Sequence, residues 1–329
     1  MGPSPILRSL SALMAAGQMT DPNTPSLMSS MRNEGAHVIE WLAYHRVIGF
    51  DRAAICTNDC VDGTDDLLDA LAEAGIVTHI RNEVSEGVPP QHAAARLLMA
   101  HFHEQGTDWA LHIDCDEFLN VHLGSGTVQE LLSGAPEADC LAIAWRNFGD
   151  GGLTEWPGAT LPHFTHREFR PRPDHTFFKC LFRPAAFGGA FAHMPTNPLK
   201  DPILINAEGD RLKTDQLFAD SPRVRFFPVE LADRAEFAMI NHYAIKSPEV
   251  FEMKRRRGRG ENVGGRSKYR VGSEWHRRAN RNDVEDRSIL RHWDATRAEM
   301  RRLRTLPGVS EIEARAVRWF DRRRQKFMP

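Results

Sequence analysis

The sequence predicts an α/β fold in which a mostly parallel sheet is flanked by helices. Short apolar runs typical of buried strands alternate with longer segments that repeat apolar residues at helical spacing, and short connections join them. This alternation is typical of a parallel sheet covered by helices on both faces. The chain is also long enough to bury a sizeable core, because 41% of its 329 residues are apolar.

The strand–helix alternation begins at residue 26. Gly49 and Gly75 are expected to end the first two helices, since glycine readily takes the left-handed conformation that closes a helix. Asp62 or Thr64 is available to cap the second helix. The expected strands are residues 26–31, 52–58, 77–83 and 109–120, and the expected helices lie within residues 36–49, 59–75 and 91–106.

The second half of the chain offers further elements. A fifth strand begins at Cys140 and leads into a glycine-rich loop, and later apolar segments carry Lys179 and His242. Residues 283–304 and 310–327 show helical spacing and are separated by Pro307 and Gly308, so we expect two terminal helices. Three aromatic residues of this half are suited either to stacking on a sugar ring or to the core: Trp145, Phe148 and Trp156.

Charge divides the chain into two parts. Residues 251–329 contain 23 of the 42 Lys and Arg residues and 11 of the 44 Asp and Glu residues, so this region carries +12 while the rest carries −14. A basic surface attracts phosphate, nucleic acid, anionic lipid or the acidic body of its own protein. We therefore expect a lead segment (1–25), a main domain (26–250) and a basic helical extension (251–329).

The sequence gives no sign of membrane insertion or export. No apolar stretch approaches about 18 residues, and Ser9 and Ser11 interrupt the weakly apolar N-terminal segment, so we expect a cytoplasmic protein. The basic C-terminal helices add the expectation of a peripheral contact with an anionic membrane at its inner face. Five cysteines without CxxC spacing fit reduced thiols better than a disulfide framework.

Three carboxylates lie where the fourth strand is expected to end: Asp114, Asp116 and Glu117. In open α/β sheets, ligands bind at the carboxyl ends of the strands. Two aspartates two residues apart can hold one hard cation and leave coordination positions for the phosphate oxygens of a substrate. The alternative is a pair of exposed carboxylates that cap the following turn. The preceding buried strand favours a ligand site.

Five motifs in order resemble the family 2-type glycosyltransferases, and most closely a bacterial subgroup. They are "RNE" at 32–34, "EWLAYH" at 40–45, "DGT" at 62–64, "PQ" at 90–91 and "IDCDEF" at 113–118. Later segments around "FKCLFRP" and "NHYAIKS" extend the resemblance to about residues 26–260. The resemblance implies the Rossmann-like GT-A fold, a nucleotide-sugar donor, and Mn²⁺ or Mg²⁺.

The resemblance assigns roles to residues that match its motifs. It implies that Asp114 and Asp116 form a DxD motif that holds the metal and contacts the donor, with Glu117 as a further member of the site. His242 is a candidate third metal ligand, because a neutral imidazole suits Mn²⁺. The residues expected to line the donor site are Arg32, Asn33, Glu34, Asn58, Asp59, Asp62, Arg81, Asp114 and Lys246. Lys179 is expected among the catalytic residues, and Lys246, Arg255 and Arg256 are expected to clamp the diphosphate.

Inverting transfer, which the resemblance implies, requires a base that takes the proton from the acceptor hydroxyl. The candidates are Asp150, Glu155 and Asp174, of which Glu155 is preferred because it precedes Trp156 after the glycine-rich loop. The expected partners are therefore a nucleotide-sugar donor and a carbohydrate or glycolipid acceptor, as in surface-polysaccharide synthesis.

Two other functions remain alternatives. A nucleotidyltransferase with a related fold lacks its usual glycine-rich N-terminal loop here. A nucleic-acid-binding protein acting through the basic region lacks interleaved aromatic residues in that region, so no nucleic acid is expected as a partner.

Overall fold

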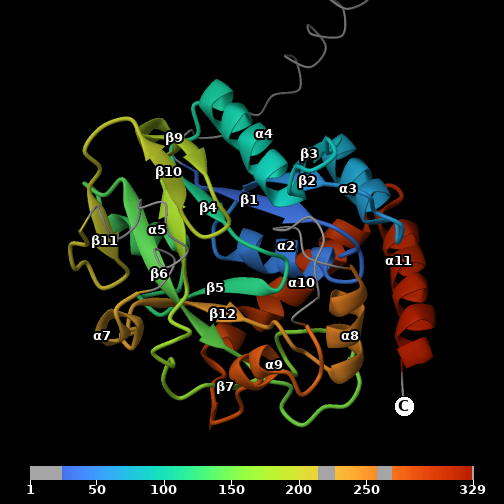
Figure 1. Cartoon of the computed structure of the whole chain (residues 1–329). Coiled ribbons are helices and arrows are strands. Elements are labelled where there is room, and N and C mark those ends of the chain that lie inside the picture. Colours follow the sequence, from blue (N-terminus) through green and yellow to red (C-terminus); the bar gives the residue numbers. More distant parts are fainter. Residues whose placement is uncertain (1–23, 214–226, 258–268, 328–329) are drawn as a thin grey trace, which may run out of the picture.

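The computed structural model describes residues 24–213, 227–257 and 269–327. Most of the predicted lead segment and the glycine-rich stretch 258–268 lie outside the described residues. The first strands and helices follow the predicted alternation (Figure 1). They are β1 (Ser26–Met31), α2 (Val38–Val47), β2 (Arg52–Thr57), α3 (Thr64–Glu73), β3 (Thr78–Arg81), α4 (Pro90–Gln105) and β4 (Ala110–His112).

The following elements complete the sheet and its edges. They are β5 (Glu117–Val121), α5 (Val128–Ser133), β6 (Cys140–Asn147), β7 (His166–Arg167), β8 (Phe178–Phe182), η1 (Pro184–Ala186), β9 (Phe187–Ala190), β10 (Pro195–Pro198), β11 (Leu204–Asn206), α7 (Val229–Ala232) and β12 (Ala238–His242). The C-terminal elements are α8 (Pro248–Arg257), α9 (Glu274–Ala279), β13 (Val284–Glu285), η2 (Ser288–His292), α10 (Trp293–Arg304), α11 (Val309–Arg324) and η3 (Gln325–Phe327).

The main sheet is mixed, with the order β3-β2-β1-β4-β8-β6-β12-β5 and β11 beside β6. Strands β3, β2, β1 and β4 are parallel, as expected for strands joined by helical crossovers. Strand β8 runs antiparallel to both β4 and β6, and β5 runs antiparallel to β12. The architecture is therefore an α/β sheet with flanking helices.

The prediction of one strand over residues 109–120 is wrong. The chain leaves the sheet after β4, turns through Asp114–Asp116, and re-enters it as β5 beside β12. The Glu117 N–H donates to the Asp114 carbonyl at 3.0 Å, which closes this turn. The acidic motif consequently lies in a turn between two strands. In the predicted single strand it would have been part of the strand itself.

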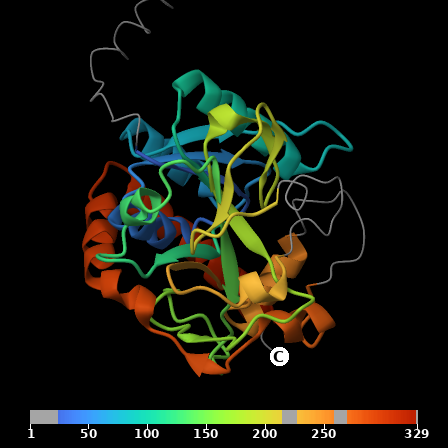
Figure 2. The ribbon, with the colours of Figure 1, turned by 90° about the vertical axis from the view of Figure 1, so that its left-hand side faces the viewer.

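Alternating residues of the central strands face two cores. Leu27, Ile55 and Leu111 belong to the core that also contains α2, α3, α10 and α11. Met28, Ala54 and Ala110 belong to the core that contains α4. The period of two in a strand therefore explains why both faces of the sheet are apolar and covered by helices. The hairpin β9–β10 packs near α4 on the second face (Figure 2).

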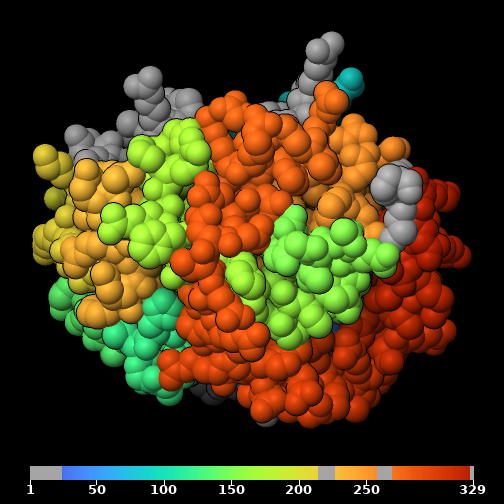
Figure 3. Space-filling view, turned by 90° about the horizontal axis from the view of Figure 1, so that it is seen from below, coloured from blue at the N-terminus to red at the C-terminus, as the bar shows by residue number. Residues whose placement is uncertain are grey.

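The basic C-terminal elements wrap around the sheet. Helix α10 packs on α2, while α11 contacts both α3 and α8. The short strand β13 pairs with β7, so the segment before α10 is tied to the loop region after β6. Figure 3 shows these orange and red segments interleaved with the green segment that follows β6. Among the described residues, no helix is both long and apolar enough to cross a membrane.

Candidate functional site

The turn between β4 and β5 is built by buried hydrogen bonds. The Asp114 N–H donates to Glu117 Oε2 at 2.8 Å, and the Trp41 indole N–H lies 3.1 Å from the carbonyl oxygens of both Asp114 and Glu117. Trp41 comes from the "EWLAYH" segment, which therefore acts as a support for the acidic turn. Tyr44 of the same helix donates to the Leu119 carbonyl at 2.7 Å.

Lys179 is the buried counter-ion of this turn. Its Nζ lies 3.1 Å from Asp114 Oδ2 and 3.1 Å from Glu117 Oε2, and it donates to the Ala192 carbonyl at 2.7 Å. Burial would lower the pKa of Lys179, but the carboxylates of Asp114 and Glu117 outweigh it and raise the pKa above its usual value. Because Lys179 and Glu117 are completely buried, both side chains position Asp114 from behind.

Asp116 and His242 come together through the sheet. Strand β12 lies between β5 and β6, with His242 opposite Glu117 on one side and Asn147 on the other. His242 Nε2 is 4.0 Å from Asp116 Oδ2, and the same oxygen accepts an ion pair from Lys254 of α8. Burial raises the pKa of Asp116, but Lys254 and His242 overcome this and hold it well below its usual range.

The orientation of His242 is set by Asn147 and Glu168. Asn147 Nδ2 donates to Glu168 Oε1 at 3.1 Å, which leaves Asn147 Oδ1 to accept from His242 Nδ1 at 3.3 Å. The Trp145 ring lies 4.0 Å from the His242 ring, centroid to centroid. Burial lowers the pKa of His242 to about 3, so the imidazole is neutral at pH 7 with the Nε2 lone pair directed toward Asp116.

A cavity of about 600 Å³ opens beside Asp116. Its walls come from the β1–α2 loop, the segment after β12, α8 and α11, and they carry seven basic residues and two acidic ones. The basic residues are Arg32, Lys246, Lys254, Arg255, Arg256, Arg257 and Arg323, the acidic residues are Glu34 and Asp116, and the remaining lining residues are Asn33, His37, Val61, Tyr243, Ala244, Val250, Met253, Trp319 and Phe320.

Lys246 is the most unusual cation of this wall. It is 3% exposed, it lines the cavity, and its backbone has a φ of 55°. Within the described ranges, its ammonium has no hydrogen bond or ion pair. Its ammonium acts electrostatically on Asp116, whose pKa it lowers. A left-handed backbone at a lysine is costly and is typical of a position held for a function.

The β1–α2 loop forms the opposite wall. Asn33, also with a positive φ of 55°, accepts from the Val61 N–H at 2.8 Å, so its side chain joins the two loops. Glu34 is paired with Arg257 of α8, and Arg257 also donates to the Arg32 carbonyl at 3.1 Å. The predicted "RNE" segment therefore does line the cavity, and part of its charge is already matched by α8.

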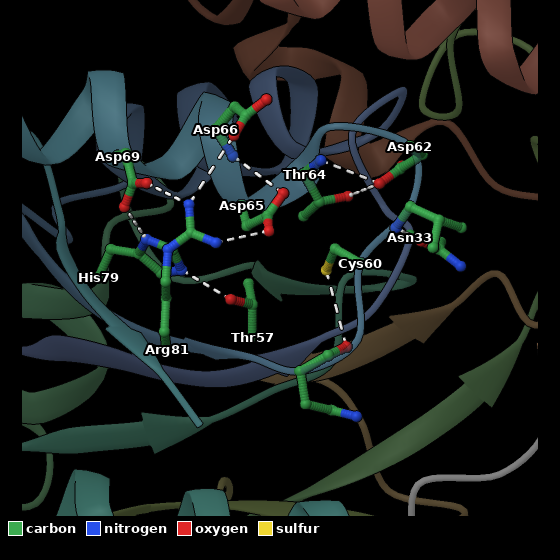
Figure 4. A network of polar contacts seen from close by, with 12 residues as sticks. Asn33, Thr57, Cys60, Asp62, Thr64, Asp65, Asp66, Asp69, His79 and Arg81 are labelled. Atoms are coloured by element: carbon green, nitrogen blue, oxygen red, sulfur yellow. Dashed lines mark hydrogen bonds and ion pairs between the residues drawn. The ribbon is translucent and has the colours of Figure 1, made fainter. Parts of the chain in front are cut away.

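Asp62 has a structural position. Its Oδ2 accepts from the Gly35 N–H at 2.9 Å, and its Oδ1 accepts from both the N–H and the hydroxyl of Thr64 at 2.9 and 2.6 Å. Thr64 in turn accepts from the Glu34 N–H at 2.8 Å. The "DGT" motif thus fastens the two loops to each other, as Figure 4 shows for Asp62 and Thr64.

Arg81 is held away from the cavity. Its guanidinium pairs with Asp65 at 2.7 Å and Asp69 at 2.5 Å on α3, and its side chain is 53% exposed (Figure 4). Asn58 donates to its neighbour Asp59 at 3.0 Å. The described walls of the cavity include Val61, and they do not include Asn58, Asp59, Asp62 or Arg81. Their role in donor binding stays a prediction.

The candidate bases also lie outside the described walls of the cavity. Glu155 is 63% exposed and 3.8 Å from Arg324 of α11. Asp150 accepts from Asn280 at 2.6 Å, and Asp174 pairs with Arg278 at 2.8 Å. The assignment of Glu155 as the base therefore stays a prediction without geometric support.

The expected stacking aromatics are core residues. Trp145, Phe148 and Trp156 are all buried, and Trp156 packs edge-on against Phe320 at 4.9 Å. Trp319 of α11 lines the cavity instead, although nothing in the sequence marked it as a site residue. Lys254, Arg257, Asn147 and Glu168 were also missed. The run of basic residues at 254–257 was the signal available for the first two, since it directly follows the segment that carries His242 and Lys246.

The described part of the chain holds no group of three His, Cys, Asp or Glu side chains arranged for a metal ion. The structure brings Asp116 and His242 together, but it pairs Asp114 with Lys179. All five cysteines are free thiols.

Comparisons with known proteins agree with part of the resemblance. No family model matches the chain. A glycosyltransferase family 92 protein of Ricinus communis is 27% identical over 142 residues, which cover 41% of this chain and 25% of that protein. A glycosyltransferase family 92 protein of Oryza sativa subsp. japonica is 29% identical over 133 residues, covering 39% and 22%. The chain thus spans about a quarter of these relatives. Similarity to glycosyltransferases is supported, and the family 2-type bacterial subgroup stays a prediction.

Proposed function

We propose that this protein is a glycosyltransferase of the GT-A type that moves a sugar from a nucleoside-diphosphate sugar to an acceptor hydroxyl. The observation that carries the proposal is the cavity at the ends of β1 and β4, where a strongly basic wall faces the acidic turn. A diphosphate is the anionic group that such a wall fits. The similarity to glycosyltransferases over two fifths of the chain favours a sugar as the group attached to it.

The basic side chains would bind and orient the diphosphate. Lys246 offers a buried ammonium, and Arg255 and Arg256 extend the same wall along α8. Charge-assisted hydrogen bonds from such groups stabilise the negative charge that develops on a diphosphate leaving group. Arg32 and Asn33 face them from the loop after β1, which suits the nucleoside end of the donor.

Asp116 and His242 fit a divalent cation, Mn²⁺ or Mg²⁺, with two protein ligands. Asp116 Oδ2 and His242 Nε2 lie 4.0 Å apart, so both atoms could contact one ion placed between them. A neutral imidazole with its lone pair directed toward the carboxylate is the required donor. When bound, the metal would act as a Lewis acid on the diphosphate. Asp114, held by Lys179, is then placed to contact the donor.

The acceptor and the stereochemistry follow from the resemblance alone. We infer inverting transfer to a carbohydrate or glycolipid hydroxyl, in surface-polysaccharide or glycoconjugate synthesis. Glu155 remains the preferred base, with Glu117 and Lys179 acting on the turn from the buried side.

Substitution of Asp116 by Asn tests the proposal. The change keeps the shape of the side chain and removes its charge. We expect the rate of Mn²⁺-dependent hydrolysis or transfer of a nucleotide sugar to be at least about 100-fold lower in the variant than in the parent. The rate is measured as release of nucleoside diphosphate across a panel of donors.

The matched control is Asp294→Asn, an exposed aspartate of α10 outside the described cavity walls, which should turn over like the parent. Circular dichroism verifies that both variants fold. Equal turnover of Asp116→Asn and the parent would contradict the role of Asp116. Failure of every donor to bind or react with the parent protein would contradict the proposed function itself.

A further inference from the structure

Lys254 occupies one oxygen of the acidic turn. Its ammonium pairs with Asp116 Oδ2, the same oxygen that lies 4.0 Å from His242 Nε2. We infer that Lys254 is a built-in cation that competes with the divalent metal for Asp116, so that metal loading requires the ammonium to move off. This inference rests on the metal site of the proposed function and adds a residue that controls its occupancy.

Aromatic rings hold the Lys254 ammonium in its position beside Asp116. Its Nζ lies 5.5 Å from the centre of the Tyr269 ring and 6.0 Å from that of Trp275, within the range of cation–π attraction. Trp275 stacks on Phe251 of α8 at 5.7 Å with an interplanar angle of 4°. An aromatic cluster therefore stabilises the ammonium beside Asp116, and α8 cannot release it without weakening these contacts.

Electrostatics makes the competition direct. Two cations at the same carboxylate oxygen repel each other strongly at a buried site, where the effective dielectric constant is far below that of water. The cavity also offers the ammonium another partner, because a diphosphate bound along α8 would place anionic oxygens beside the same helix. The metal and the donor would then displace Lys254 from Asp116 together, whereas the metal alone would have to do so unaided.

Lys254 differs from Arg255, its neighbour in the cavity wall, in the partner of its charge. Arg255 is the next residue on α8 and lines the same cavity, but its guanidinium is paired with Glu252 at 2.6 Å and does not contact Asp116. A general loss of positive charge near the metal is therefore distinguishable from the loss of the competing ammonium.

The test measures Mn²⁺ binding to the full chain without any nucleotide, by the electron paramagnetic resonance signal of free Mn²⁺. We expect Lys254→Met to bind Mn²⁺ about ten-fold or more tightly than the parent, because it removes the competing charge and keeps an unbranched side chain in the aromatic cluster. Lys254→Gln provides a second variant in case the first does not fold. Lys254→Arg keeps the charge and should bind like the parent. Arg255→Met should change affinity by less than about three-fold.

Two results would overturn the inference. One is Mn²⁺ affinity in Lys254→Met and Lys254→Gln equal to that of the parent, including the case in which none of them binds the ion. The other is a gain that persists after Asp116 is also replaced by Asn. If Lys254→Met tightens Mn²⁺ binding while no nucleotide sugar is a substrate, the proposed function fails and the competition at Asp116 stands.

Discussion

Asp114, Asp116 and Glu117 are close in the chain, yet their side chains enter different surroundings. Asp116 lines the cavity, Glu117 is fully buried, and Asp114 is one-third exposed with one oxygen bound to Lys179. The tight turn between β4 and β5 causes this separation. Only Asp116 therefore faces the cavity and lies near His242, while its Oδ2 is paired with Lys254, and the other two carboxylates define the shape of the turn.

Glu168 supplies a pH-dependent test at the scale of one residue. Burial raises its pKa from 4.5 to about 7, against the hydrogen bonds from Asn147, which lower it. A carboxyl group with a raised pKa in the folded state binds more protons when folded, so its contribution to stability falls as the pH rises from 4.5 through 7.

Replacing Glu168 by Gln removes this titration. The free energy of unfolding of the variant, relative to the parent, should increase by about 2.5 kcal/mol between pH 5 and pH 8, measured by urea denaturation at each pH. A difference that is independent of pH would show that Glu168 is ionised in the folded protein throughout this range.

At the scale of elements, α11 packs against the loop after β1 at very close range. A Cβ atom added to Gly35 would lie 2.7 Å from the Ala316 Cβ of α11 and 3.1 Å from Asp62 Oδ2. Two small residues thus permit the contact that brings Trp319 and Phe320 to the cavity. The "RNEG" segment needs its glycine because a helix from the far end of the chain rests on it.

Gly35→Ala should therefore destabilise the protein by about 1–3 kcal/mol, because it forces α11 away from the loop. Ala316→Gly alone should cost about 1 kcal/mol as a helix substitution. The double variant should lose less free energy of unfolding than the sum of the two single losses, by about 1 kcal/mol or more, because Ala316→Gly makes room for the new methyl group. Additive effects in chemical denaturation would contradict the close contact.

At the scale of the whole molecule, the acidic body is one partner of the basic C-terminal region. Arg257 and Arg315 of this region pair with Glu34 and Asp66 of the main domain. In a third pair the signs are exchanged, because Arg46 of the main domain pairs with Glu299 of the C-terminal region. Besides Arg323, which lines the cavity, three exposed arginines of α10 and α11 have no ion pair within the part of the chain that the structure describes: Arg301, Arg318 and Arg322. They are the groups we propose for a peripheral contact with anionic lipid.

This contact is testable with vesicles of phosphatidylcholine and phosphatidylglycerol. The protein should sediment with them at low salt and be released at high salt, since each surface cation contributes only about 1 kcal/mol. Arg318→Gln combined with Arg322→Gln should reduce the bound fraction. The control Arg96→Gln removes a charge from the exposed face of α4 and should leave the bound fraction unchanged. Equal binding of all variants would assign any membrane affinity to another surface.

The sequence by itself determined the alternation of strands and helices up to α4, because the periods of two and 3.6 are properties of the local chain. It also placed the acidic motif at the edge of the sheet. Among the predicted site residues, those adjoining strand ends, such as Arg32, Asn33 and Asp116, line the cavity.

Only the tertiary structure decided which residues share the site. Lys254 reaches Asp116 across 138 positions, and α11 closes the cavity from the end of the chain. The split of residues 109–120 into β4 and β5 depends on pairing with β12, and Asp62 and Arg81 are engaged by loop and helix partners. Such contacts arise from the order of strands and the packing of helices, and local periodicity carries no information about either.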